Sequence, residues 1–402
     1  MSFMRRSVGV DIGTSEVKVV VAEESERGLL PRIVAVGHAE SRGLRHGYVV
    51  QPAEAVKSVR RAIRQAEKAS GARITRAYLG VSGVGLSSAT AVGGAMVSRA
   101  DNEISELDLA HAQEEAHRLV PPASSANRRV IHAVPLESRI DGRKVLGNPL
   151  GMRGARLETR QLFVTCVEQH YEAFVEALEE SQAEAADLAA GPIAAAFVGL
   201  TRPQKVAGAA LVDIGAETTS IVVFEEEAPV SLEVFPIGGA AVTNDIALGL
   251  RISLEEAEAA KRVPTSLSPG QRARLDEAAD ARAIDILDLV EAHLRRIGRA
   301  GLLPAGVTLV GGGSAWPGLA ELARDHLRLP SRAPGVAAAP TVVPAAEGQG
   351  PKLPDGAWSV AYGLAVWGFS AEDGGSVRLG YAGKAARQMS ERLRRWVRQF
   401  MP

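Results

Sequence analysis

The sequence predicts an α/β protein of two lobes with a duplicated core, because one β-hairpin pattern occurs twice. Residues 7–24 read SVGVDIGTSEVKVVVAEE, and residues 209–226 read AALVDIGAETTSIVVFEE. With Val10 placed on Val212, the two segments share VDIG, a pair of valines and a pair of glutamates. Each is an apolar run, a tight turn of small residues and a second apolar run, which is typical of a hairpin. The copies lie half a chain apart, which indicates one hairpin for each lobe.

The composition agrees with a globular protein of more than one domain. The chain has 402 residues, of which 46% are hydrophobic and 23% are charged, so it can bury sizeable cores. A formal net charge of -1 argues against a nucleic-acid partner. The single cysteine, Cys166, excludes an intrachain disulfide and fits a reducing cytoplasm. We expect neither export nor insertion, because no apolar run can span a membrane and Asp11 comes too soon for a signal peptide.

Both hairpin turns contain the residue types of a phosphate site. These turn residues are Gly13, Thr14 and Ser15 in the first copy, and Gly215 and Thr218 in the second. Small residues let backbone N–H groups approach phosphate oxygens, and hydroxyls add donors. Asp11 and Asp213 can hold Mg²⁺ through water between the lobes, and Lys18 can reach a terminal phosphate. The alternative is that each Asp-x-Gly merely ends a strand, but its repetition favours the phosphate site.

Two further glycine turns and one helix extend this nucleotide-binding pattern. The turn residues are Gly238 and Gly239, before the helix-like stretch 240–249, and Gly311, Gly312 and Gly313, after the apolar run 307–310. Such turns can lie against a phosphate or a base, although a flexible loop is the alternative at 311–313. Glu258 and Lys261 share one face of a helix that Ser253 is expected to cap. These two side chains can bind a ribose or base, or they can form a surface ion pair.

The order of these parts resembles the superfamily of actin, the Hsp70 chaperones and sugar kinases. Several stretches are similar, more specifically, to the bacterial cell-division family FtsA. They are SRGLRHG at 41–47, AYLGVSG at 77–83, VIHAVP at 130–135, NPLGM at 148–152, GGAAVTNDIA at 238–247 and AEAAK at 257–261. Together with the first hairpin they run over nearly the whole chain. The resemblance implies ATP and Mg²⁺ as cofactors.

The resemblance also implies an actin-like two-lobed α/β fold with a duplicated nucleotide-binding core, an inserted small α+β subdomain (IC) and a C-terminal amphipathic helix. The boundaries that we expect are 1–85 and 161–200 for subdomain IA, 86–160 for IC, 201–240 and 300–370 for IIA (the latter returning to IA), 241–299 for IIB, 371–383 for a linker and 384–402 for the membrane-binding helix.

The function implied by the resemblance is to tether filaments of FtsZ, the tubulin-like ring protein, to the cytoplasmic side of the membrane at the division septum. IIB is expected to bind the C-terminal peptide of FtsZ. Arg295, Arg296 and Arg299 are candidate contacts, and a solvated basic helix face is the alternative. IC is expected to support self-association and to recruit later division proteins.

One departure from the family concerns the second phosphate turn, which is usually glycine-rich and here contains Ala216 and Glu217. An acidic side chain repels phosphates unless it points away or helps to order Mg²⁺ or water. Glu217 therefore argues against fast ATP hydrolysis more than against ATP binding. Glu168, after the expected strand 161–167, is a weak candidate for a catalytic base, and a surface residue that starts a helix is the better interpretation. We expect at most a slow ATPase with a structural and regulatory role.

The C-terminal segment has the pattern of a membrane anchor. Residues 376–402 contain seven bases and one acid. At about 100° per residue, the large apolar side chains of 384–402 share one helix face and most arginines share the other. The expected membrane-binding residues are Met389, Leu393, Arg395, Trp396, Val397, Arg398 and Phe400. Such a helix lies in the surface of an anionic membrane, and packing on its own domain or on a partner is the alternative.

Three other functions use the same superfamily fold. A pilus-assembly adaptor would normally lack the terminal Arg/Trp helix, a small-molecule kinase would need a substrate pocket and a catalytic Asp, and an Hsp70-type chaperone would need a β-rich peptide-binding domain. The sequence contains no HExxH, Walker A or Rossmann GxGxxG pattern. The Ala-rich stretch 183–196 is expected to be a packed helix.

Overall fold

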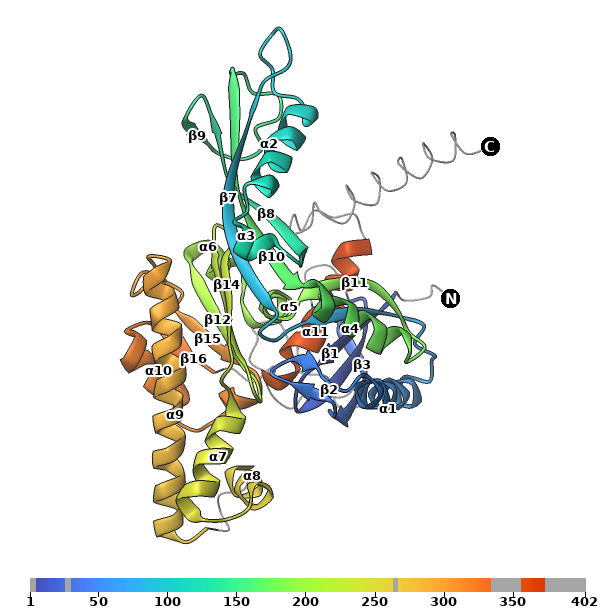
Figure 1. The fold of residues 1–402 in the computed structure, drawn as a ribbon, viewed down its shortest axis with the longest axis vertical. Helices are drawn as coiled ribbons and strands as arrows, with labels where there is room; N and C mark the ends of the chain where they lie inside the picture. The colour runs from blue at the N-terminus through green and yellow to red at the C-terminus, as the bar shows by residue number, and fades with distance from the viewer. Residues whose placement is uncertain (1–4, 26–29, 263–266, 334–355, 373–402) are drawn as a thin grey trace.

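The computed structural model describes residues 5–25, 30–262, 267–333 and 356–372 (Figure 1). We call 5–85, 168–200 and 356–372 lobe I, 86–167 the inserted subdomain, and 201–333 lobe II. Among the helices described in these ranges, none combines the length and the apolar character that crossing a membrane requires. The predicted membrane helix at 384–402 and most of the predicted linker at 371–383 lie outside the described residues.

Lobe I is built on a five-stranded sheet with the strand order β11-β6-β1-β2-β3. The strands are β1 (Arg6–Ile12), β2 (Glu16–Glu23), β3 (Arg32–Glu40), β6 (Arg76–Val81) and β11 (Glu184–Ala190). The first three are antiparallel, whereas β6 runs parallel to β1 and β11 parallel to β6. A short ribbon follows β3, made of β4 (Leu44–Arg45) and β5 (Tyr48–Val49).

Helices cover both faces of this sheet. Helices α1 (Pro52–Ser70) and α4 (Glu168–Glu179) pack on one face, and α11 (Ser359–Glu372) packs on the other. Because neither face meets water, β1 and β2 are apolar almost throughout instead of alternating. Helix α5 (Gly191–Gly199) lies between α11 and the sheet of lobe II.

The prediction of one packed helix over 183–196 is wrong in its first half. Residues Glu184–Ala190 form β11, which pairs with β6, and only from Gly191 does the chain become helical. Alanine favours a helix locally, but strand pairing with β6 and burial beside α4 override that preference.

The inserted subdomain is an antiparallel sheet with the strand order β7-β10-β8-β9. Its elements are β7 (Leu86–Met96), α2 (Glu106–Arg118), α3 (Pro122–Ser125), β8 (Arg128–Ile140), β9 (Arg143–Val145) and β10 (Arg156–Val167). Helix α2 packs on β7 and β10. The far end of the sheet projects away from both lobes, and β7 and β10 join it to lobe I (Figure 1).

Lobe II repeats the hairpin plan of lobe I in a sheet with the strand order β14-β13-β12-β15-β16. The strands are β12 (Ala209–Ile214), β13 (Thr219–Glu225), β14 (Ala228–Phe235), β15 (Val307–Val310) and β16 (Ser331–Arg332). Helices α9 (Pro269–Arg296) and α10 (Leu319–Leu327) cover one face. Helix α6 (Arg202–Ala207) leads into β12.

Helices α7 (Gly239–Leu250) and α8 (Leu254–Arg262) form a smaller group against the N-terminal half of α9. Figure 1 shows this group at the end of lobe II opposite the inserted subdomain. The predicted cap at Ser253 is present, since its Oγ accepts a hydrogen bond from the Glu256 amide at 3.2 Å. Two 3-10 turns, η2 (Gly312–Ala315) and η4 (Gly356–Trp358), complete the fold.

Candidate functional site

The first hairpin turn presents a buried carboxyl group beside a lysine. Asp11 ends β1 and pairs in register with Lys18 of β2, and the Gly13 amide closes the turn on the Glu16 carbonyl at 3.2 Å. Burial raises the pKa of Asp11 to about 6, although the charge of Lys18 opposes the rise. The Lys18 ammonium lies 3.4 Å from a Glu16 carboxylate oxygen. Thr14 is half-buried and Ser15 is exposed.

The second hairpin turn has the same geometry at the equivalent positions. The Gly215 amide donates to the Thr218 carbonyl at 2.8 Å, as Gly13 does to Glu16. Burial raises the pKa of Asp213 to about 7, and the nearby charge of Asp11 adds to the rise while Lys18 lowers it. Asp11 is buried and Asp213 is half-buried. The two carboxyl groups belong to different lobes, and the charge of one disfavours ionisation of the other.

The Gly-Gly turn at 238–239 lies directly on the second hairpin turn. The Gly239 amide donates to the Gly215 carbonyl at 2.9 Å. A Cβ on Gly238 would lie 2.6 Å from that same carbonyl oxygen. Only glycine fits at 238. The Ala240 amide likewise donates to the Ala216 carbonyl at 2.7 Å, so the first two N–H groups of helix α7 hold it against the second hairpin turn.

The Glu/Lys pair is connected to this turn. The Lys261 ammonium donates to the Gly239 carbonyl at 3.0 Å and to Thr243 Oγ1 at 2.6 Å, and it pairs with Glu258 at 2.6 Å. Burial alone would raise the pKa of Glu258, but hydrogen bonds from Lys261, Thr243 and Arg262 lower it to about 2. The pair is therefore part of the site's framework as well as a candidate ligand of a ribose or base.

The triple-glycine turn packs against the second hairpin as well. Gly311 has φ +84°, and a Cβ there would lie 2.2 Å from Asp213 Oδ1. A Cβ on Gly313 would lie 2.4 Å from Ile214 Cγ2, whereas a Cβ on Gly312 would make only an ordinary contact with Ala357 Cβ at 3.9 Å. The turn leads into the 3-10 helix η2, and the α-helix α10 begins only at Leu319.

The fold thus gathers the glycine turns of lobe II around the hairpin that carries Asp213, and the charges of Asp11 and Lys18 from lobe I act on that aspartate. A ligand with phosphates and a cation suits this arrangement, because the glycines expose backbone N–H groups and a cation would favour the ionised form of both carboxyls. The glycines at 238, 311 and 313 leave no space for any larger residue.

The arginines predicted to contact FtsZ lie elsewhere and are engaged within the chain. Arg295 pairs with Glu291 at 2.7 Å, and Arg296 and Arg299 pair with Glu233 and Glu225 of lobe II strands. They lie at and just beyond the C-terminal end of α9, far along that helix from α7 and α8 (Figure 1). Glu168 is the first residue of α4 and pairs with Arg129, as its interpretation as a surface residue predicts.

Sequence reasoning missed one contact of the site. His46 of lobe I donates its backbone N–H to Glu217 Oε2 at 2.5 Å. The Glu217 carboxylate therefore points out of the phosphate turn toward lobe I. The SRGLRHG resemblance marked this stretch, but nothing in the sequence connected it with a residue so far along the chain.

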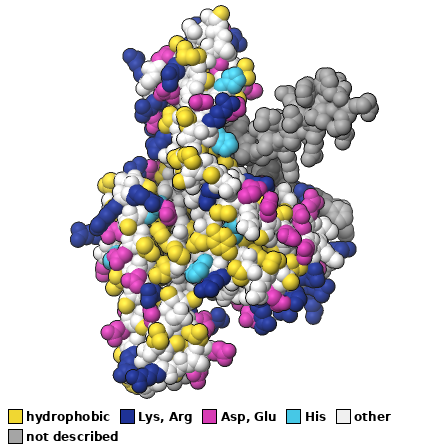
Figure 2. Space-filling model, in the orientation of Figure 1, with side chains coloured by type: hydrophobic (Ala, Val, Ile, Leu, Met, Phe, Trp, Pro, Cys, Tyr) yellow, Lys and Arg dark blue, Asp and Glu magenta, His cyan; other side chains and the backbone are white. Residues whose placement is uncertain are grey.

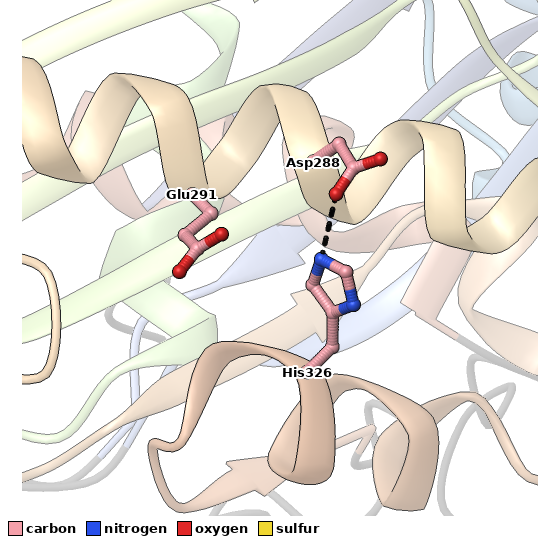
Figure 3. A group of neighbouring side chains, drawn as sticks. All are labelled: Asp288, Glu291 and His326. Atoms are coloured by element: carbon pink, nitrogen blue, oxygen red, sulfur yellow. Dashed lines mark hydrogen bonds and ion pairs between the residues drawn. The ribbon is translucent and has the colours of Figure 1, made fainter.

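Two other features lie apart from these turns. Asp288 and Glu291 of α9 face His326 of α10 (Figure 3). His326 Nε2 is bonded to Asp288 at 2.9 Å and Glu291 is paired with Arg295, so this cluster has the contacts of a helix–helix junction.

A cavity of about 520 Å³ in lobe I is bordered by four bases, Arg60, Arg64, Lys68 and Arg73. Figure 2 shows Lys and Arg side chains gathered in this part of lobe I, where α1 lies. The cavity is beside the C-terminal ends of α1 and α4, and helix carbonyls at such ends attract cations.

Known proteins show the same organisation. The family model of the cell division protein FtsA matches residues 210–350, and that of the SHS2 domain inserted in FtsA matches residues 86–165. The chain is 32% identical to the cell division protein FtsA of Pseudomonas aeruginosa over 419 residues, which covers 97% of each protein. It is 33% identical to that of Bacillus subtilis over 342 residues, covering 80% of this chain and 76% of the relative.

Solved structures confirm the fold class. The PilM-PilN type IV pilus biogenesis complex matches with a TM-score of 0.66 and 22% identity, covering 90% of this chain and 98% of that one. MreB5 of Spiroplasma citri bound to ADP matches with a TM-score of 0.50 and 13% identity, covering 92% and 98%. These distant similarities show an actin-like two-lobed fold. The relatives that match over most of their length show the family: the chain belongs to the FtsA family of cell-division proteins.

Proposed function

We propose that this protein binds ATP with Mg²⁺ between its lobes and tethers FtsZ filaments to the cytoplasmic face of the membrane at the division septum. The observation that carries the nucleotide part is that Asp11 and Asp213 occupy matching positions of hairpin strands in different lobes and that the charge of Asp11 raises the pKa of Asp213. A cation between them would offset their mutual repulsion.

The residues of the site then have distinct roles. Backbone N–H groups of the two hairpin turns donate to phosphate oxygens, and Lys18 supplies a positive charge beside them. Asp11 and Asp213 hold Mg²⁺ through water, and the ion neutralises part of the phosphate charge. The turn at 311–313 takes the adenosine, and Glu258 with Lys261 borders the ribose or base.

The same residues lead us to expect that ATP is hydrolysed slowly at most. Glu168, the one base considered from sequence, is paired with Arg129 at the start of α4, and the Glu217 carboxylate is bonded to His46. Neither is free to accept a proton from an attacking water. We therefore propose that ATP acts mainly as a ligand that favours self-association.

The tether itself depends on the C-terminal segment and on lobe II. The amphipathic pattern of 384–402 supports binding to an anionic phospholipid membrane. We propose that the region 241–299 takes the FtsZ C-terminal peptide and that the inserted subdomain recruits later division proteins. Arg295, Arg296 and Arg299 already pair with carboxylates of this chain, so acids on the peptide would compete with these partners or share the guanidinium groups with them.

Nucleotide binding is tested by titrating the full chain with ATP and Mg²⁺. We expect Asp213→Asn to weaken Mg²⁺-dependent ATP binding at least tenfold. Asp325→Asn, which makes the same change on the exposed surface of α10, should have no effect. Equal binding by both variants would contradict the assigned site.

The tether is tested by sedimentation with anionic liposomes and FtsZ in the presence of ATP. The intact chain should carry FtsZ to the liposomes, and a chain truncated after Gly375 should not. If the intact chain binds lipid but never carries FtsZ, an adaptor for another membrane assembly becomes the better proposal. If neither chain binds liposomes, the segment 384–402 is not a membrane anchor.

A further inference from the structure

Glu217 belongs to the phosphate turn of lobe II, yet its polar contacts are with lobe I. Its Oε2 accepts a hydrogen bond from the His46 backbone N–H at 2.5 Å, and its backbone carbonyl lies 3.3 Å from His46 Nδ1. Both residues are half-buried. A hydrogen bond from an amide to a carboxylate is strengthened by the charge, and this one joins the lobes at the edge of the candidate nucleotide site.

The donor is held in place by the backbone around it. His46 has φ +49° and Gly47 has φ +80°, so the chain turns sharply between β4 and β5. A Cβ on Gly47 would lie 2.4 Å from the Gly83 Cα, and the His46 carbonyl accepts from the Val84 amide at 3.3 Å. The backbone conformation therefore orients the His46 amide toward lobe II.

The same contact reaches the root of the inserted subdomain. Gly83 and Val84 lie in the connection from β6 to β7, the strand that begins that subdomain. The Ser82 carbonyl in this connection lies 2.8 Å from Nε2 of the buried His170. A shift of Glu217 would thus be transmitted through His46 to the segment from which the inserted subdomain projects.

We propose that Glu217 is a positioning residue that, with His46, forms an interlobe clasp over the nucleotide. The clasp keeps the second phosphate turn against lobe I and holds the Glu217 carboxylate away from the phosphates. When it opens, the lobes lose a contact and a negative charge is free to approach the phosphate oxygens. Both effects speed nucleotide release. The proposal rests on the proposed ATP site and goes beyond it, because it explains why an acidic residue is tolerated in this turn.

The existence of the clasp can be tested without nucleotide, by amide hydrogen exchange on the full chain. Glu217→Ala should raise exchange of the His46 amide about tenfold and raise exchange over 82–86 as well. Glu217→Gln retains an acceptor oxygen and should restore most of the protection. Glu255→Ala, on the exposed face of α8, is the matched control. Unchanged exchange at His46 in Glu217→Ala would overturn the proposal.

Its role in holding nucleotide is tested by the dissociation rate of ATP with Mg²⁺. Glu217→Ala should release ATP about tenfold faster than the wild type, and Glu217→Gln should be close to the wild type. Slower release from Glu217→Ala would mean that Glu217 only repels phosphate, which overturns the clasp's role. If the wild type binds no ATP, the proposed function fails together with that role, while the exchange experiment still decides whether the clasp exists.

Discussion

Gly311 and Asp213 are in such close contact that a Cβ on Gly311 would lie 2.2 Å from Asp213 Oδ1. Gly311 belongs to the turn after β15, and Asp213 ends β12, the neighbouring parallel strand. The Asp213 carboxyl group therefore lies directly against the backbone at residue 311. Glycine is required here for the contact and for the positive φ of +84°.

Gly311→Ala should destabilise the protein by about 3 kcal/mol, because it combines a steric clash with left-handed backbone. Gly318→Ala separates the two effects, since Gly318 has φ +83° but nothing within 4 Å of its Cβ position. We expect a cost of about 1 kcal/mol there. Denaturant unfolding of both variants measures the difference, and equal costs would show that the clash is relieved by a small shift.

In the absence of nucleotide, the contribution of Asp11 and Asp213 to the stability of the protein should fall as the pH rises from about 4 to 7. The pKa of Asp11 is raised to about 6 and that of Asp213 to about 7, against about 3.9 in an unfolded chain. The folded state therefore binds more protons, and the stability that this gives is present below the unfolded pKa and lost as the pH passes through the folded values. For Asp11 alone the loss is on the order of 3 kcal/mol.

Unfolding scans between pH 4.5 and 8 measure this loss, and Asp213→Asn should flatten the profile. Binding of Mg²⁺ requires the ionised carboxylates, so stabilisation by ATP with Mg²⁺ should grow over the same pH range. A ligand effect that is independent of pH would show that neither carboxyl takes part in binding the cation.

Lys261→Ala should weaken ATP binding about tenfold, which corresponds to about 1.4 kcal/mol. The variant loses the bonds to the Gly239 carbonyl and to Thr243 that connect α8 to the Gly-Gly turn. Arg262→Ala is the matched control, because Arg262 also pairs with Glu258 but is largely exposed. Titration with ATP compares the two, and we expect less than a twofold change for Arg262→Ala.

Ser88→Ala should loosen the inserted subdomain from lobe II. The Ser88 hydroxyl of β7 donates to the Leu232 carbonyl at 2.7 Å and accepts from the Leu232 amide at 2.9 Å, so it occupies the edge of β14. Loss of these bonds should cost about 1–2 kcal/mol and raise amide exchange at Leu232. Ser87→Ala, whose hydroxyl contacts Thr165 within the subdomain, should leave Leu232 unchanged.

Replacing Arg395 and Arg398 together by Gln should weaken liposome binding about 30-fold at low salt, since each arginine near an anionic surface contributes about 1 kcal/mol. Sedimentation over a salt series measures this effect. The difference from the wild type should shrink toward 1 M salt, where charges are screened within about 3 Å. A constant difference at every salt concentration would indicate an effect on helix formation instead of charge.

The two hairpins were predictable because their determinants are local. An apolar run, a glycine turn and a second apolar run specify strands and turn together, and the Gly13–Glu16 and Gly215–Thr218 bonds close within each copy. The order of the glycine turns and the helix with Glu258 and Lys261 could also be predicted from the sequence, because each is a short motif with its own pattern.

Only the tertiary structure showed the features that depend on contacts between residues far apart in the sequence. Glu184–Ala190 is a strand because β6 pairs with it, and Arg296 and Arg299 are engaged because Glu233 and Glu225 of lobe II face them. The direction of the Glu217 side chain depends on an amide in the other lobe. The sequence by itself determined the two hairpins, the glycine turns and the family. Contacts between distant segments determined which charged side chains are paired, because ion pairs between such segments depend on how the lobes pack and not on neighbouring residues.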